Sequence, residues 1–192
     1  LIMDFINSDA QSIASFLSEP VQVEEIYVYM QTNYGTSVTP FYTTLALWVG
    51  GIVLVALMKV KVDYEDDEFK DATEHQKYMG RALLFLAMGQ LQALVVVLGD
   101  LYILKIDCTH PFMLWLAAAI TSFVFTLFIY TLVLTFGDLG KAVAVVMIVL
   151  QIAGSGGTYP IELLPEFFQN VYLYFPFPYA INAMREAISG LY

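Results

Sequence analysis

The chain has 192 residues, of which 59% are hydrophobic and 14% are charged, and its formal net charge is -10 at pH 7. Soluble domains average about 45–50% apolar and about 25% charged residues, so this composition argues against a soluble domain. No basic patch favours nucleic-acid binding, and the acidic residues cluster outside the apolar runs. The composition therefore predicts an integral membrane protein.

Four apolar runs are long enough to cross a bilayer as helices, because about 20 residues at about 1.5 Å each span a core of roughly 30 Å. Pro40 and Pro111 stand where a proline suits the first turn of a helix. Gly50 and Gly51 predict the close approach of a neighbouring helix. The predicted spans are 40–58, 82–104, 111–136 and 142–157.

Two polar segments separate these runs on one side of the membrane. Residues 59–81 form an insert with a predicted amphipathic surface helix at 71–80, and residues 137–141 form a predicted tight turn. Together they carry six of the eight lysines and arginines, so the positive-inside rule places them in the cytoplasm. Residues 1–38, as the end of an extracellular region, and 158–192 then lie outside.

The segment after the fourth run has the pattern of a re-entrant external hairpin. Glycines end the helix, and two short proline-started amphipathic helices follow within 158–190. Irregular backbone at membrane depth is tolerated only where protein or a watery cavity satisfies its polar groups, so the segment is a functional candidate. We expect Arg185 and Glu186 to pair with neighbouring elements, with lipid phosphate as the alternative for Arg185. The candidate residues are Gly154, Gly156, Gly157, Pro160, Pro176, Pro178, Arg185 and Glu186.

Three polar side chains lie within the second run. Gln90 and Gln92 are about 200° apart around a helix and cannot share one face. We expect them to join helices through hydrogen bonds, with substrate contact as the alternative. Asp100 is the one acid within a span, and a membrane carboxylate is a functional candidate. Its place near the outer end leaves two structural alternatives open, contact with water or a pair with Lys105.

Ser122, Thr126 and Tyr130 form one polar stripe in the third run, because they are spaced by four residues. The stripe is expected to face the bundle interior or a partner subunit. Hydroxyl groups also bond back to their own helix, and this packing role is the alternative to a transport role.

The order of several short motifs resembles the C-terminal membrane domain of phage infection proteins, the YhgE/Pip family. The closing motif is also similar, more loosely, to the permease half of ABC-2-type exporters. The resemblance covers about 15–192. Its motifs are residues 33–35, 39–41, 45–50, 89–93, 98–100 and 155–160, together with Pro165, Phe167, Phe168, Pro176, Pro178, Tyr179, Arg185 and Glu186.

The resemblance implies an all-α polytopic membrane bundle that is one part of a longer protein. An N-terminal span, an external domain and a last span would lie outside this chain. It further implies a transport or secretion component in the cell membrane of a Gram-positive bacterium, working as a homodimer among membrane lipids. An ATPase or secretion-system subunits are the expected partners. A phage tail protein would bind through the external domain.

The insert at 59–81 occupies the place of the coupling helix in such exporters, where a cytoplasmic ATPase docks. Its candidate coupling residues are Asp66, Asp67, Glu68 and His75, and a solvated loop is the alternative reading. For the whole chain, the alternative to transport is a passive anchor. The anchored external domain would act as a phage receptor or as an accessory protein of type VII secretion.

The sequence predicts no enzyme, cofactor or metal site. No paired catalytic groups share a depth, and Gly154 to Gly157 lack the Lys-Ser/Thr that completes a phosphate-binding loop. His75 and His110 fall on opposite membrane sides. The single Cys108 excludes an internal disulfide and a cysteine zinc site, and is predicted to be an inert small residue.

Overall fold

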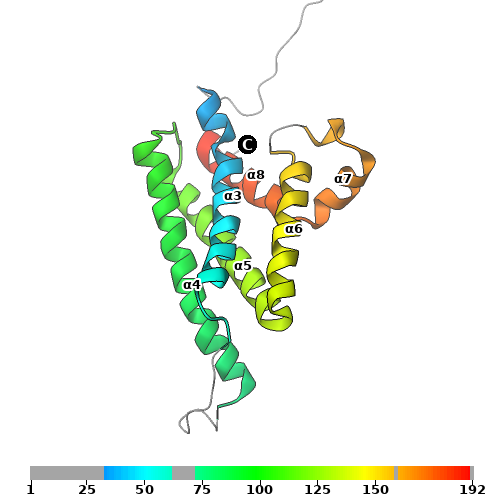
Figure 1. The fold of residues 1–192 in the computed structure, drawn as a ribbon. Coiled ribbons are helices and arrows are strands. Elements are labelled where there is room, and N and C mark those ends of the chain that lie inside the picture. The colour runs from blue at the N-terminus through cyan, green and yellow to red at the C-terminus, as the bar shows by residue number, and fades with distance from the viewer. Residues whose placement is uncertain (1–32, 62–71, 158–159, 191–192) are drawn as a thin grey trace, which may run out of the picture.

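The computed structural model of the protein describes residues 33–61, 72–157 and 160–190. This part of the chain is helical and contains no strand, which confirms an all-α membrane bundle (Figure 1). Three helices are long and apolar enough to cross a membrane, namely Tyr34–Leu57, Glu74–Ile103 and Pro111–Phe136. Residues 1–32 and the candidate coupling residues Asp66, Asp67 and Glu68 lie outside the described residues.

Helix α3 (Tyr34–Leu57) begins before Pro40, so Pro40 does not lie in the first turn of the helix as the sequence predicts. The Asn33 side chain caps the helix, because its Oδ1 accepts a hydrogen bond from the Thr36 N–H at 2.8 Å. Pro40 therefore lies inside the helix. Gly50 and Gly51 admit two different neighbours, since a Cβ at Gly50 would overlap the Gln92 amide and one at Gly51 would lie 2.9 Å from Ile129.

Helix α4 (Glu74–Leu98) continues into a π-helical turn, η2 (Gly99–Ile103). Thr73 and Gln76 form a capping box: the Gln76 N–H donates to Thr73 Oγ1 at 3.3 Å, and the Thr73 N–H donates to Gln76 Oε1 at 2.9 Å. The separate surface helix predicted at 71–80 is wrong. The cap at Thr73 starts a helix that runs directly into the second apolar run.

Helix α5 (Pro111–Phe136) has the bounds of the third apolar run, and α6 (Asp138–Gly154) follows after one residue. Gly137, at φ 61, makes the whole turn, so the predicted turn at 137–141 and the span at 142–157 are both shifted. Gly140 packs directly on the α5 backbone, where a Cβ would lie 2.9 Å from Val133 Cα. At 17 residues, α6 is about 25 Å long, which is short for the hydrocarbon core.

The closing segment consists of η3 (Ile161–Leu163), α7 (Glu166–Val171), η4 (Tyr172–Tyr174) and α8 (Pro176–Ser189). Pro176 opens α8 and Pro178 lies in its first turn, as expected for a proline-started helix. Gly190, at φ 99, ends it. Its buried residues are Phe177, Pro178, Ala180, Ile181, Met184, Ala187 and Ile188.

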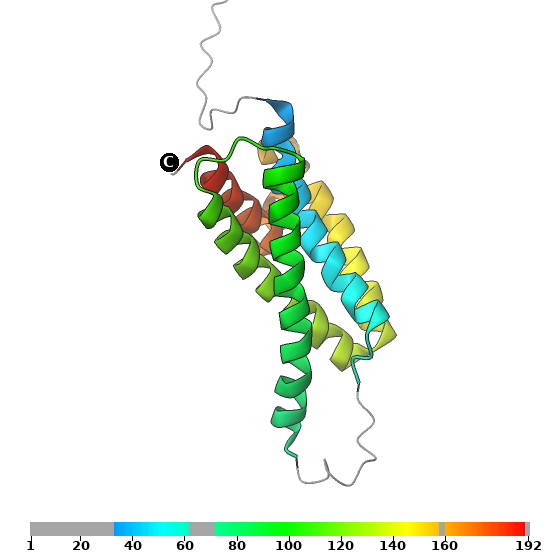
Figure 2. The same cartoon turned by 90° about the vertical axis from the view of Figure 1, so that its left-hand side faces the viewer.

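The helices run between two ends, which we call the 105–110 end and the 137 end (Figures 1 and 2). Helices α3 and α5 run toward the 137 end, and α4 and α6 run back. Helix α5 is central, because it contacts α3, α4, α6 and α8. Helix α8 starts partway along the bundle and ends beside the 105–110 loop, where the Thr109 N–H donates to the Ile188 carbonyl at 2.9 Å.

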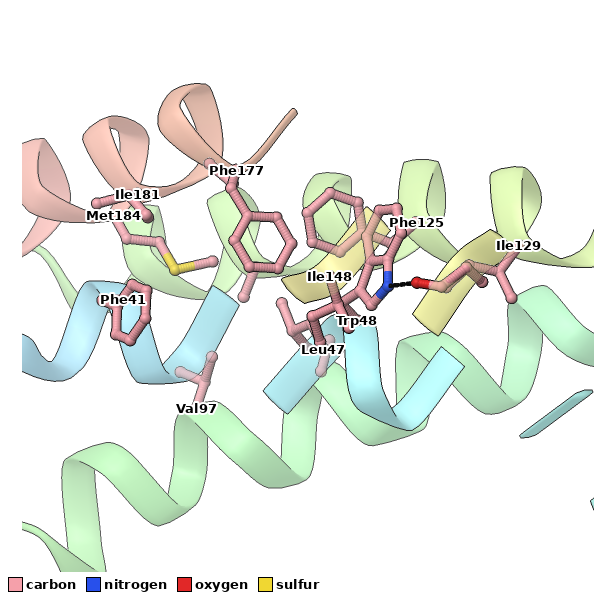
Figure 3. Packing of buried hydrophobic residues seen from close by; sticks show 14 of the residues in the cluster. Phe41, Leu47, Trp48, Val97, Phe125, Ile129, Ile148, Phe177, Ile181 and Met184 are labelled. Carbon is pink, nitrogen blue, oxygen red and sulfur yellow. Dashed lines mark hydrogen bonds between the residues drawn. The ribbon is translucent and has the colours of Figure 1, made fainter. Parts of the chain in front are cut away.

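The core of the bundle lies where α8 meets α3 and α5 (Figure 3). Trp48 is fully buried, and its ring centroid lies 4.9 Å from Phe125 and 5.6 Å from Phe177. The indole Nε1–H donates to the Ala144 carbonyl of α6 at 3.2 Å. One tryptophan therefore contacts three of the other helices.

Candidate functional site

Asp100 lies in the π-helical turn of α4 and is 7% exposed. Its Oδ2 accepts a hydrogen bond from the Thr43 hydroxyl of α3 at 2.6 Å. Lys105, at φ 52, is exposed, and within the described residues it forms no ion pair with Asp100. Asp100 thus bonds to α3 and does not pair with Lys105. π-Helical turns often mark functional sites, so Asp100 stays a candidate.

Gln90 and Gln92 contact different helices, as their angular separation predicts. Gln90 Nε2 donates to the Ala119 carbonyl of α5, and Gln92 Nε2 donates to the Ala46 carbonyl of α3, both at 3.0 Å. Each bond satisfies a backbone acceptor of a neighbouring helix. Both amides therefore make the interhelical contacts that their spacing favours.

The polar stripe of α5 faces α4 inside the bundle. Ser122 Oγ donates to the Gly89 carbonyl at 2.7 Å, and the Tyr130 hydroxyl donates to the Tyr78 carbonyl at 3.2 Å. Thr126 Oγ1 is buried and has no hydrogen-bond partner among the residues that the structure describes, and a Cβ added at Gly89 would lie 2.5 Å from it. Ser122 and Thr126 therefore sit against Gly89 of α4, and Tyr130 bonds to the backbone of the same helix at Tyr78.

Gln151 of α6 is a buried polar residue that the sequence analysis missed. It is 0% exposed, and neither its Oε1 nor its Nε2 has a hydrogen-bond partner among the described residues. It belongs to the buried face of α6 with Ala144, Ile148 and Gly154. The helical spacing of this face could have revealed it, since Gln151 is seven residues beyond Ala144.

The end of α6 is tied to α8 by Arg185. The guanidinium Nη2 donates to the carbonyls of Gly157 at 3.2 Å and Gly156 at 3.5 Å, and Nη1 donates to Asn182 Oδ1 at 3.4 Å. Gly156 has φ 64, and a Cβ at Gly157 would collide with Phe41. Arg185 thus holds an irregular glycine turn at the 105–110 end.

The other predicted hairpin residues are spread along the same segment. Gly154 lies against α7, because a Cβ there would lie 2.8 Å from Phe168. Pro160 is exposed and begins the η3 turn, where its carbonyl accepts from the Leu163 N–H at 3.2 Å. The Glu186 carbonyl accepts from the Gly190 N–H at 3.0 Å at the end of α8.

At the 137 end, the ends of α3 and α4 are joined by Arg81, whose guanidinium donates to the Lys59 carbonyl. His75 is exposed in the first turn of α4. In the described part of the chain, no group of three or more His, Cys, Asp or Glu residues is placed to hold a metal ion.

Cys108 lies in the loop at the 105–110 end. Its Sγ donates to the Ala187 carbonyl at 3.6 Å, and burial raises the pKa of its thiol, so the thiol is largely protonated near neutral pH.

Together, the apolar helices, the tied glycine turn and the inserted α8 define a multi-pass membrane domain. The ABC-2 type transporter family matches residues 75–188, so the chain belongs to this family. ABC-2 membrane domains are transporter domains and are not catalytic by themselves.

The chain is also similar to Uncharacterized protein YhgE of Bacillus subtilis (strain 168). The two are 30% identical over 185 residues, which are 96% of this chain and 23% of the relative. The chain therefore spans about a quarter of that relative's length, and the resemblance to the YhgE/Pip family is confirmed. No solved structure matches.

Proposed function

We propose that this bundle is the membrane domain of a cell-envelope exporter or secretion component. It works as a homodimer in the bacterial cell membrane, with an ATPase on the side of the 59–81 insert. The substrate path runs between two copies, and the segment 154–190 closes it on the outside. Membership of the ABC-2 family supports transport, and the position of α8 supports a moving part within the bundle.

The observation that carries this proposal is the insertion of α8 between the longer helices. Phe177 is 0% exposed and stacks on Phe125 at 5.5 Å, and Thr44 of α3 donates to the Met184 sulfur at 3.6 Å. A passive anchor needs only spanning helices. A helix that begins partway through the bundle leaves irregular backbone at membrane depth, which is costly and is typical of functional regions.

Two side chains support a second conformation of the same segment. Arg185 holds the end of α6 on α8, whereas the unpartnered Gln151 amide destabilises the packing of α6 next to it. A ligand or an ATPase shifts such an equilibrium only through a difference in its affinity for the two states. We infer that separation of α6 from its neighbours admits water to the path between them, and that hydrogen bonds from this water to Gln151 lower the free energy of the second state.

The second candidate is a passive anchor for an external domain that acts as a phage receptor or as a type VII secretion accessory protein. The length of the relative favours it, because 77% of that protein lies beyond the matched quarter (100% less 23%). The extensive hydrogen bonding between helices also suits a rigid anchor.

The proposal is tested by purifying the full-length protein from its native membrane in mild detergent and identifying the proteins bound to it. We expect an ATPase that is lost when residues 63–71 are deleted, because that part of the predicted docking segment precedes the cap and first turn of α4. A protein with Gly80 changed to Ala serves as the control, since a Cβ there meets open space. Absence of any ATPase from a stable, correctly inserted protein contradicts the exporter proposal and favours the anchor.

Asp100→Asn is expected to impair transport strongly while changing the free energy of unfolding by less than about 1 kcal/mol. The asparagine keeps an oxygen that accepts from Thr43, so the α3–α4 contact survives while the ionisable carboxyl group is lost. Transport activity and membrane levels of the two proteins are compared directly. Wild-type transport by Asp100→Asn would assign the carboxylate a purely structural role.

A further inference from the structure

A cavity of about 410 Å³ opens at the 137 end, between the end of α3 and the α5–α6 turn. The two segments lie side by side in both views of the fold (Figures 1 and 2). Lys59, Lys61 and Lys141 line its polar part, and Asp138 is the acid among its lining residues. Three positive charges therefore face one negative charge in this cavity.

The three lysines of the cavity differ in whether they form an ion pair. Lys141 Nζ pairs with Asp138 at 3.0 Å, and the side chains are 39% and 97% exposed. Lys59 and Lys61 are exposed, and within the described part of the chain neither side chain forms an ion pair. The Lys59 carbonyl, but not its ammonium group, is held by Arg81. Two lysines thus remain for an anionic ligand, and a third is shared.

The remainder of the lining is hydrocarbon. Val55 and Met58 come from the last turn of α3, Val133 from α5, and Leu57 beside them is 81% exposed. The apolar run of α3 ends at this level, and the lysines follow at once in the sequence. The lining of the cavity therefore changes from apolar side chains on the membrane side to cationic groups further out. This is the same order as acyl chains and headgroups at a membrane interface.

We propose that this cavity binds an anionic glycerophospholipid. Lys59 and Lys61 contact its phosphate, and the exposed Leu57 and the half-buried Met58 contact the upper part of an acyl chain. A soluble phosphate matches the lysines but leaves the hydrocarbon lining exposed, and an acidic protein segment does the same. Basic residues at the membrane surface bind anionic lipid through charge, and here the cavity adds a fixed apolar contact. This site is independent of the proposed transport function.

The test uses the full-length protein in detergent, titrated with phosphatidylglycerol or phosphatidylcholine, with bound lipid counted by native mass spectrometry. Wild type is expected to bind phosphatidylglycerol more tightly than phosphatidylcholine. The K59Q/K61Q protein should lose about fivefold in phosphatidylglycerol affinity for each lysine removed. Lys105→Gln, at the other end of the bundle, should bind like wild type, and Asp138→Asn should bind more tightly because it frees Lys141.

Equal phosphatidylglycerol affinity of K59Q/K61Q and wild type would overturn the proposal. Competition by inorganic phosphate at the same concentration would also overturn it, because it would show a soluble-anion site without an acyl-chain contact. A copurified acidic protein that excludes the lipid would assign the surface to a protein partner instead. Unfolding midpoints in phosphatidylcholine identify any variant that fails to fold, and the single changes Lys59→Gln and Lys61→Gln then replace the double one.

Discussion

Trp48→Ala is expected to lower the free energy of unfolding by about 3–5 kcal/mol, the usual cost of truncating a buried tryptophan. Trp48 is 0% exposed and contacts Phe125 and Phe177, and its indole bonds to the Ala144 carbonyl. The loss of dispersion contacts and the cavity left behind weaken packing in lipid as well as in water. The change therefore loosens α8, α6 and α3 together, measured by thermal or detergent-induced unfolding.

Trp115→Ala is the matched control, because these two are the tryptophans of the chain. Trp115 is only partly buried and packs on Phe112, with ring centroids 5.6 Å apart. We expect it to cost about 1 kcal/mol or less. Each variant keeps one tryptophan whose fluorescence reports on unfolding. Equal losses from both changes would contradict the central place of Trp48 in the core.

Gln151→Leu is expected to have the opposite sign and to raise the free energy of unfolding by about 1–3 kcal/mol, the usual cost of an unsatisfied buried polar group. Leucine approximates the shape of the glutamine and removes two buried atoms that have no hydrogen-bond partner. If the inferred second state gives this amide its partners, the leucine also disfavours that state and slows transport. Unfolding and transport are measured on the same preparations.

Gln90→Leu is the control for this change, since its amide donates to the Ala119 carbonyl at 3.0 Å. Removing that bond should destabilise the bundle by about 0.6–2 kcal/mol. The same substitution thus has opposite effects at the two positions. Destabilisation by Gln151→Leu would show that the amide has a hydrogen-bond partner in the folded state. Gln151 would then no longer support a second conformation of α6.

The strong apolar runs were sufficient to predict the bundle, whereas the helix ends depended on side-chain caps. The third run was bounded by Pro111 and by Gly137, and α5 has those ends. For α3, Asn33 proved a stronger start signal than Pro40, because its side chain satisfies a free N–H of the first turn. For α4, the Thr73 capping box joined a polar segment to an apolar one that composition alone had separated.

The candidate site was predictable in residue type but not in partner. Periodicity identified the stripe containing Ser122 and Tyr130, yet the sequence left open which surface it faces, because that depends on how the helices pack. Asp100 was expected to meet water or Lys105, and only the packing of α3 on α4 shows its bond to Thr43. Gln151 was missed because a single amide in an apolar run belongs to no motif, and only its spacing from Ala144 marks it as a residue of the buried face.

In the closing segment, too, the sequence predicted the local structure but not the long-range contacts. Its glycines and prolines predicted a break and two short helices, which the structure contains. The depth of α8 depends on Phe177 and Met184, which look like ordinary apolar residues of an amphipathic helix in the sequence. Burial against Trp48 and Thr44 is a long-range property and leaves no local signal.

The central claim is that the bundle takes part in transport, and an anchor exchange tests it most directly. The gene for the full-length protein is deleted and then restored either as wild type or with residues 34–190 replaced by an unrelated polytopic anchor of the same orientation. The extracellular fraction of each strain is inventoried by mass spectrometry. We predict that material lost on deletion returns with wild type but not with the exchanged anchor, although both proteins reach the membrane. Full return with the exchanged anchor would contradict the transport function.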